Sequence, residues 1–200
     1  ELAAVGTNSA AAGSSSVARR SAGLESFLRT NTSVANTLGG TGYVSSTLSG
    51  STQGFPNTSP TDGTQRAFTE TILKAALRIG YEAGATPKML MVGPAQKQNV
   101  SAFAGIAQQR RDTGDSPAVI VGAADVYVGD FGRVNVVPNR IQRNRTAFLL
   151  DPEYCALCFL RPFMQFPLAK TGDAEKRALL VEWSLKVKHE GALVKIADLT

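Results

Sequence analysis

The sequence has few of the residues that build metal centres and redox sites. Its 200 residues include only two cysteines and a single histidine, His189. One histidine excludes a site that needs a histidine pair, and the pattern around His189 favours a packed or half-exposed side chain. Two cysteines are too few to staple a secreted fold of this size, so we expect synthesis in a reducing, intracellular compartment. We expect no metal and no cofactor.

The two cysteines have the spacing of a redox motif, but their surroundings do not fit one. Cys155 and Cys158 lie in an apolar run that predicts a strand, whereas a reactive pair needs a helix N-terminus to lower the thiol pKa. Residues three apart in a strand point to opposite faces. We therefore predict free thiols that pack in the core and have no redox function.

Long apolar runs and signatures of catalysis are also missing. No stretch approaches the ~20 apolar residues of a membrane-spanning helix, so we expect no membrane contact. Neither a Walker lysine motif nor a G-x-S-x-G nucleophile elbow occurs. Asp151 and Glu153 flank a proline, which favours turn carboxylates; a general acid at Asp151 is the enzymatic alternative. We predict that the protein is not an enzyme.

What the chain has in plenty is small polar residues near its start. Serine, threonine, glycine and asparagine fill 32 of the first 60 positions, most densely over 36–60. Such a segment buries little apolar surface, so we predict a long loop outside the core at 36–60. One helical patch interrupts the region at 22–28, with Leu24, Phe27 and Leu28 on one face.

Regular elements follow. Apolar residues at helical spacing predict an amphipathic helix over 63–83, capped by Thr61 or Asp62 and ended by Gly84. The short apolar run Met89–Val92 predicts a buried strand, and Pro94 then opens a second helix that extends to about residue 107.

From residue 118 the apolar period changes to two. Val126 and Val128 alternate with Asp125 and Tyr127, and a similar strand follows the turn-forming residues 129–132. This pattern predicts a β-hairpin. Further strands are expected over 148–150 and 154–160, with a turn at Asp151 between them.

The last long element is unusual in length. Val181, Trp183, Leu185 and Val187 alternate with polar residues over 176–190. A single strand of this length spans about 50 Å, against ~5–6 residues for a typical strand, which indicates an elongated shape. We predict that Trp183 is a buried core anchor in this strand.

Positive charge is modest but clustered. The net charge of +5 is below that of a dedicated nucleic-acid binder, yet four arginines and no acid lie between residues 131 and 150. They are Arg133, Arg140, Arg143 and Arg145. Either they form a solvated loop, or they make a basic face for phosphates or for acids of a neighbouring subunit. We favour intersubunit ion pairs over DNA contact, with Asp112, Asp115 or Asp125 as partners.

Six sequence blocks in order resemble one protein family. They are AGLESFL (22–28), TDGTQRAFTETIL (61–73), MLMVGPAQKQNVSAFAGIA (89–107), VGAADVYVGDFGRVNVVPNR (121–140), LDPEYCALCFLRPF (150–163) and LAKTGDAEKRALLVEWSLKV (168–187). In this register they look like the major capsid (major head) proteins of tailed bacteriophages with the Hong Kong 97-type fold.

The resemblance implies an α+β fold with an axial domain and an elongated peripheral domain. Residues 1–60 would be the end of a spine helix and a Ser/Thr/Gly-rich loop, 61–150 mainly the axial domain, and 151–200 peripheral-domain strands and the C-terminus. Relative to the family pattern, we expect the N-terminal arm and most of the spine helix to be absent from this chain.

The implied function is structural. Copies would assemble as hexamers and pentamers into an icosahedral head that encloses phage double-stranded DNA through non-specific contact. Scaffolding, portal or decoration proteins would be further partners, and the protein would be made in the host cytoplasm and reside in the virion. Two alternatives stay open: a nucleic-acid-binding module that uses the Arg133–Arg145 cluster, and an encapsulin-like nanocompartment shell.

Overall fold

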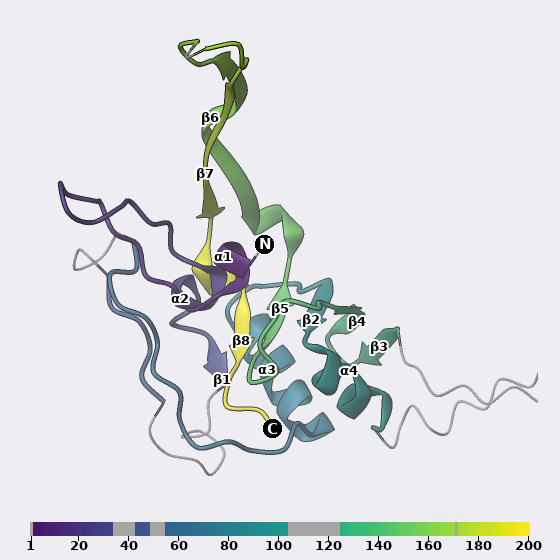
Figure 1. Cartoon of the computed structure of the whole chain (residues 1–200). Helices are drawn as coiled ribbons and strands as arrows, with labels where there is room; N and C mark the ends of the chain where they lie inside the picture. The colour runs from purple at the N-terminus through teal and green to yellow at the C-terminus, as the bar shows by residue number, and fades with distance from the viewer. Residues whose placement is uncertain (1, 34–42, 49–54, 104–124, 171) are drawn as a thin grey trace, which may run out of the picture.

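The computed structural model describes residues 2–33, 43–48, 55–103, 125–170 and 172–200. Over these residues the fold is mixed α+β, with a six-stranded sheet in the body and a two-stranded ribbon that projects from it (Figure 1). The sheet order is β1 (Thr32–Ser33), β8 (Val194–Ile196), β5 (Ala147–Leu150), β2 (Met89–Val92), β4 (Gly132–Pro138) and β3 (Val126–Gly129). The β1–β8 and β2–β4 pairs are parallel and the other pairs are antiparallel.

The two sheet faces are covered unequally. Helices α3 (Glu70–Glu82) and α4 (Pro94–Ser101) lie on one face, where they pack against the inward side chains of the sheet strands. The short helices α1 (Leu2–Val5) and α2 (Leu24–Phe27) lie on the other face, over Phe148 and Leu150 of β5. All four residues of β5 are therefore buried, because this strand is covered on both faces.

The hairpin predicted after residue 118 is confirmed, but strand β3 buries the side chains of the face opposite to the one that its valines predicted. β3 and β4 pair antiparallel from Val126 to Gly129, and Gly132 has a φ of +121° that favours glycine in the turn. In β3 the buried side chain is Tyr127, while Val128 is exposed. The larger aromatic ring fills the space against α3, and its hydroxyl donates to Glu70 (3.2 Å).

Both predicted helices are shorter in the structure. α3 begins at Glu70 because residues 63–66 are held extended along the C-terminus, with the Gly63 amide donating to Asp198 Oδ1 (2.7 Å) and the Arg66 amide donating to the Asp198 carbonyl (2.7 Å). Thr61 and Asp62 are thus not caps, whereas Gly84 ends the helix as predicted, with a φ of +80°. α4 ends at Ser101; residues 104–107 lie outside the described part of the chain.

The ribbon is formed by β6 (Cys155–Pro167) and β7 (Arg177–Val187). β6 runs well beyond the predicted end at residue 160, and β7 is somewhat shorter than the predicted 176–190. Trp183 is half-buried and Cys158 is exposed, so the predictions of a buried tryptophan and of two core cysteines are wrong for the single chain. Both thiols are free, as expected.

The polar segment 36–60 is more ordered at its described parts than its composition predicts. Val44 pairs with Thr61 and Leu48 pairs with Pro56, so the chain after residue 43 and the chain before residue 61 run antiparallel to each other. Tyr43 is buried, with its ring over the ammonium group of Lys195 at 5.0 Å. The prediction that this segment stays outside the core is therefore wrong at Tyr43; residues 36–42 and 49–54 lie outside the described residues.

Candidate functional site

The four arginines do not form one surface. Arg143 and Arg145 turn toward acids of their own chain, whereas Arg133 and Arg140 are exposed. The reason is local. Arg133 projects from the outer side of β4, while Arg143 and Arg145 lie in the connection that leads into β5 and passes beside α2. Adjacency in sequence therefore predicted a cluster that the fold divides.

Arg143 makes a pair of two-pronged contacts. Its Nη2 and Nε donate to the Glu25 carboxylate at 2.6 and 3.2 Å. Its Nη1 and Nη2 donate to the two oxygens of Asp62 at 3.0 and 2.8 Å. Since the guanidinium fork matches a carboxylate in this geometry, Arg143 fixes α2 to the segment that precedes α3.

Arg145 extends the same network toward the C-terminus. Its Nη2 donates to the Gly63 carbonyl at 2.7 Å and lies 3.5 Å from Asp198 Oδ1. Asp198 is buried and has a φ of +59°, which is uncommon for a residue with a side chain. The Asp198 carboxylate also accepts from the Gly63 amide, so this backbone conformation serves to aim it at the arginine segment.

Lys195 completes the network from within the sheet. Its side chain is fully buried, its Nζ donates to the Glu25 carbonyl at 2.9 Å, and the Tyr43 ring lies over it. Burial lowers the pKa of Lys195 to about 8, an effect opposed by Glu25 and Glu190. We call the set Glu25, Asp62, Arg143, Arg145, Lys195 and Asp198 the ionic cluster.

Burial and pairing shift the pKa values of the acids in the ionic cluster in opposite directions. Desolvation raises the pKa of Glu25, because the attraction of Arg143 and Lys195 only partly offsets its complete burial. The hydrogen bond from Arg143 lowers the pKa of Asp62, which remains partly open to solvent. Sequence reasoning missed Glu25, Lys195 and Asp198, since each is a single charge inside an apolar run without a distinguishing motif. The ionic cluster joins segments far apart in sequence, and its role is to hold the body together.

The two exposed arginines remain free for contacts outside the chain. Among the described residues, neither Arg133 nor Arg140 makes an ion pair or a side-chain hydrogen bond. Of their predicted acidic partners, Asp125 pairs with Lys97 of its own chain at 3.0 Å. Asp112 and Asp115 lie outside the described residues.

The enzymatic alternative gains no support at Asp151. Its carboxylate is buried and accepts from the Glu153 amide at 3.2 Å, which caps the single turn Pro152–Tyr154. Lys88 lies 3.5 Å from Asp151 and 2.9 Å from Glu153, so both acids serve the turn into the ribbon. His189 is exposed and contacts the Tyr154 ring. Within the described ranges there is no group of three or more potential metal ligands and no helix long enough to cross a membrane.

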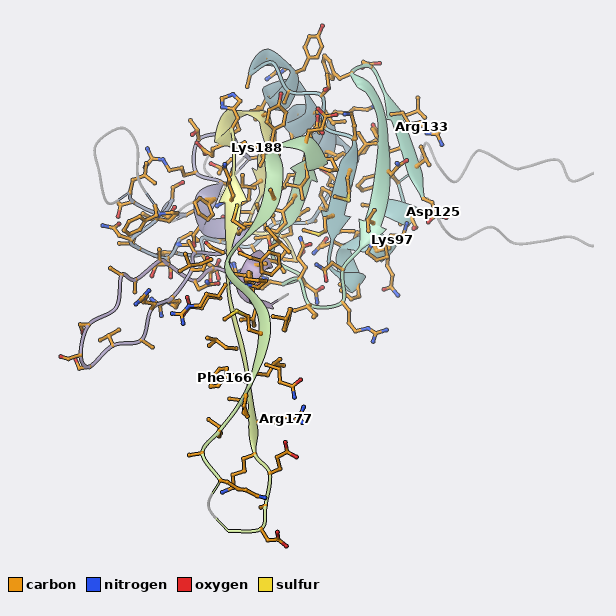
Figure 2. The ribbon with its side chains drawn as sticks, turned by 90° about the horizontal axis from the view of Figure 1, so that it is seen from above. Lys97, Asp125, Arg133, Phe166, Arg177 and Lys188 are labelled. Carbon is orange, nitrogen blue, oxygen red and sulfur yellow. The ribbon has the colours of Figure 1, made fainter. Side chains whose placement is uncertain are left out.

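Exposed large apolar side chains are concentrated on the ribbon. Half of the large apolar side chains that the described residues leave exposed lie here: Leu157, Phe159, Leu160, Phe163, Met164, Phe166, Leu168 and Leu179. Figure 2 shows Phe166 and Arg177 on the part of the ribbon that extends past the body. These eight side chains are the ribbon surface.

The ribbon surface is apolar on both faces, because β6 is irregular. Phe159 lies opposite Trp183, and Phe166 lies opposite Ala178. Trp183 and Ala178 are an odd number of residues apart in the continuous strand β7, so the two pairs face opposite ways. Register shifts between Phe159 and Met164 carry the apolar pattern of β6 from one face to the other.

A groove lies where the ribbon leaves the body. It is lined by residues of the 11–21 segment and by Phe159 and Trp183 of the ribbon. Ser21 Oγ and Ser184 Oγ are 2.8 Å apart and tie the two walls together. The 11–21 segment lies beside Trp183 in this groove, so Trp183 is half-buried instead of exposed.

Comparison with known proteins gives the chain a family. No curated protein sequence matches it. A solved structure described as "Crystal structure of virus-like particle from Pyrococcus furiosus" aligns over 66% of this chain and 54% of its own chain, with 11% identity and a TM-score of 0.38. The family described as SU10 major capsid protein matches residues 1–200. The prediction of a phage major capsid protein is thereby confirmed: this chain belongs to the SU10 major capsid protein family.

Proposed function

We propose that copies of this chain assemble into the hexamers and pentamers of a closed icosahedral head that encloses double-stranded DNA. The fold proposed for it is of the Hong Kong 97 type. The single observation that carries the proposal is the ribbon surface, which projects from the body and is apolar on both faces.

A ribbon of this kind requires a partner. An isolated two-stranded hairpin is marginally stable in water, and contiguous apolar patches on soluble proteins mark interaction sites. Because the tip of the ribbon extends away from its own body, the described residues of that body do not cover it (Figure 2). Other copies of the same chain are the partners that a capsid family supplies.

The domain division follows the same lines. We assign 61–150, which supplies most of the sheet with α3 and α4, to the axial domain, and 151–200, which supplies the ribbon, to the peripheral domain. The C-terminal strand β8 returns from the ribbon to the sheet, so the two domains share the body. α1 and α2 pack on the sheet face opposite α3, and we assign residues 1–60 to the end of the spine helix and a Ser/Thr/Gly-rich loop.

Of the four arginines predicted to make intersubunit or phosphate contacts, two remain available for such contacts. Arg133 and Arg140 are exposed, and we assign to them contacts with a neighbouring copy or non-specific contacts with packaged DNA. The guanidinium groups of Arg143 and Arg145 are occupied by Glu25, Asp62 and Asp198. Scaffolding, portal or decoration proteins would meet the assembled shell, which is made in the host cytoplasm.

Two alternative functions differ from the proposed one in what the protein would enclose or bind. An encapsulin-like nanocompartment shell would enclose cargo protein instead of DNA. A nucleic-acid-binding module would bind DNA as a monomer with a steep salt dependence, but Arg143 and Arg145 pair within the chain, which leaves only Arg133 and Arg140 of the four arginines for phosphates.

The test is expression of the full-length gene product, electron microscopy of the purified material, and extraction of its contents. We expect closed shells of uniform size that hold nuclease-protected DNA when made during infection. Phe163→Asp should abolish shells by placing a charge on the ribbon surface, whereas Val17→Asp, at an exposed site outside the ribbon, should not. Monomers alone from the wild type, or shells filled with protein, would contradict the proposal.

A further inference from the structure

The groove at the base of the ribbon combines an apolar floor with a positively charged wall. Phe159 and Trp183, which lie opposite each other in the β6–β7 pair, belong to the floor. Arg19 and Arg20 belong to the wall that the 11–21 segment supplies. The volume of the groove, about 660 Å³, lies in the range of protein binding sites. We call it the ribbon groove; its lining is residues 11, 12, 19–21, 158–160 and 181–184.

The positive charge of the ribbon groove is not neutralised within the described residues. Arg20 donates to the carbonyl and hydroxyl oxygens of Ser9 at 2.8 and 2.9 Å, so its partner is neutral. Arg19 is exposed, and its guanidinium makes neither an ion pair nor a hydrogen bond with the described part of the chain. The acid in the lining, Glu182, is already paired with Arg161 at 3.0 Å. The ribbon groove therefore favours a partner that is apolar and carries a negative charge.

The turn between β3 and β4 has this complementary character. Asp130 and Phe131 are its two central residues, and a side chain at Gly132 would meet no atom within 4 Å, so the turn projects into open space. Phe131 leaves 37% of its surface exposed and lies against the exposed Tyr81 at the end of α3, with ring centroids 5.1 Å apart. We call Tyr81, Asp130 and Phe131 the turn knob.

The negative charge of the turn knob is also unpaired. Among the described residues, Asp130 and Asp173 are the two exposed acids that make neither an ion pair nor a side-chain hydrogen bond. Asp173 lies between lysines at the ribbon tip, whereas Asp130 lies beside the two aromatic rings. The nearby cation Arg133 points away from these rings, because Val134 next to it faces the α3 side, where Tyr81 lies.

We propose that the turn knob of one copy docks in the ribbon groove of a neighbouring copy. In this contact Phe131 packs on Trp183, and the Asp130 carboxylate pairs with Arg19. The inference rests on the proposed function, because it names one of the contacts that form when copies assemble. A contact between two different patches of one chain is heterologous, as in rings.

The contact forms between copies because its two parts lie on opposite sides of the ribbon in one copy. In Figures 1 and 2 the 11–21 segment lies on one side of the ribbon, and β3, an edge strand of the sheet, lies on the other. Ser21 Oγ and Ser184 Oγ, 2.8 Å apart, hold the groove wall to the ribbon. The Tyr127 hydroxyl donates to Glu70 and holds β3 to α3. Both parts are thus fixed to their own body.

The test is a reversal of the two charges. Asp130→Arg and Arg19→Asp each bring like charges together in the contact, so each should lower the yield of particles about tenfold or more. The double variant Arg19→Asp/Asp130→Arg restores opposite charges and should recover most of the wild-type yield. Both residues are exposed and unpaired, so unassembled subunits of all three variants should keep the wild-type denaturation midpoint.

The matched control combines Arg19→Asp with Asp173→Arg. This variant has the same net charge as the double variant, but it reverses the other unpaired acid and should not recover assembly. Wild-type yields from both single variants, a double variant as impaired as the single ones, or equal recovery in the control would overturn the inference and leave the proposed function standing. A wild-type product that forms no particles would instead overturn the proposed function.

The fluorescence of Trp183, the single tryptophan of the chain, tests the inference in the wild type. The ring lines the ribbon groove and is half-buried in one copy. Docking of Phe131 should cover it, so quenching by acrylamide should be several-fold weaker in particles than in free subunits. Equal quenching in the two states, or full protection in particles of Phe131→Ala, would overturn the inference.

Discussion

The body and the ribbon differ in how far their β-strands are buried. In the body, β5 has all four residues buried and lies between α3 on one face and α2 on the other. In the ribbon, β6 is exposed from Leu157 to its end. Among the described residues, the central strand of the body is covered on both faces, whereas the ribbon leaves its apolar side chains exposed, and the proposed assembly would cover them.

Charge follows the same division. In the ionic cluster of the body, Glu25, Lys195 and Asp198 are buried, and each of the six members meets an opposite charge or a backbone partner. Ribbon charges such as Arg161 and Glu182 pair at the surface, where a pair contributes only ~0–1 kcal/mol. Changes in the body should thus alter the stability of a subunit, and changes in the ribbon should alter its assembly.

The largest expected effect is on subunit stability after Arg143→Ala. This change leaves the buried Glu25 carboxylate without its two-pronged partner. Removing one member of a buried pair costs about 3–5 kcal/mol of unfolding free energy. Chemical denaturation of unassembled subunits measures it.

Arg140→Ala is the matched control for this prediction. Arg140 is exposed in the same segment, so its loss should change the free energy of unfolding by no more than about 0.5 kcal/mol. Equal losses in the two variants would show that the ionic cluster does not stabilise the body.

The second prediction concerns alkaline pH. Burial lowers the pKa of Lys195 to about 8, from 10.5 for an ordinary lysine. Between these values the unfolded chain keeps a proton that the folded chain has lost, so the free energy of unfolding should rise with pH across this window. Lys195→Met should remove this rise when denaturation is compared at pH 8 and pH 10. An unchanged pH slope in the variant would place the lysine ammonium in solvent.

The third prediction is an intermediate cost at the base of the ribbon. Trp183 is half-buried beside the groove, so Trp183→Ala should lower the free energy of unfolding by about 1–2 kcal/mol, within the usual range for a single substitution. A loss above about 4 kcal/mol in unassembled subunits would restore its role as a core anchor. Thermal unfolding followed by the circular dichroism of the backbone, which does not need the tryptophan as a probe, distinguishes a partly buried side chain from a core anchor.

The fourth prediction is a variant that has the smallest effect on the stability of the subunit and yet impairs assembly. Phe163 has 68% of its surface exposed, so Phe163→Ser should change the free energy of unfolding by at most about 0.5 kcal/mol. Sedimentation of the same variant should show fewer particles than the wild type. Unimpaired assembly would mean that the ribbon surface stays in solvent.

Local patterns in the sequence predicted most individual elements. The strand Met89–Val92, the hairpin at 126–138 and the end of α3 at Gly84 follow from apolar period and turn residues, which act over a few positions. The start of α3 could not be found this way. It is set by hydrogen bonds from residues 63–66 to Asp198, more than 130 residues away.

The candidate site was harder to predict than the elements. A run of arginines without acids indicated a single basic face, but pairing with Glu25 and Asp62 depends on how distant segments meet. The apolar faces of β6 were hidden for a related reason. Register shifts change which residues share a face, and a strict period of two does not contain them.

The central claim is that neighbouring copies bury the ribbon. Electron cryomicroscopy of particles assembled from the full-length product tests it most directly. The account predicts closed shells in which protein density of adjacent copies covers both faces of the β6–β7 ribbon. Shells in which the ribbon lies free in solvent would contradict it.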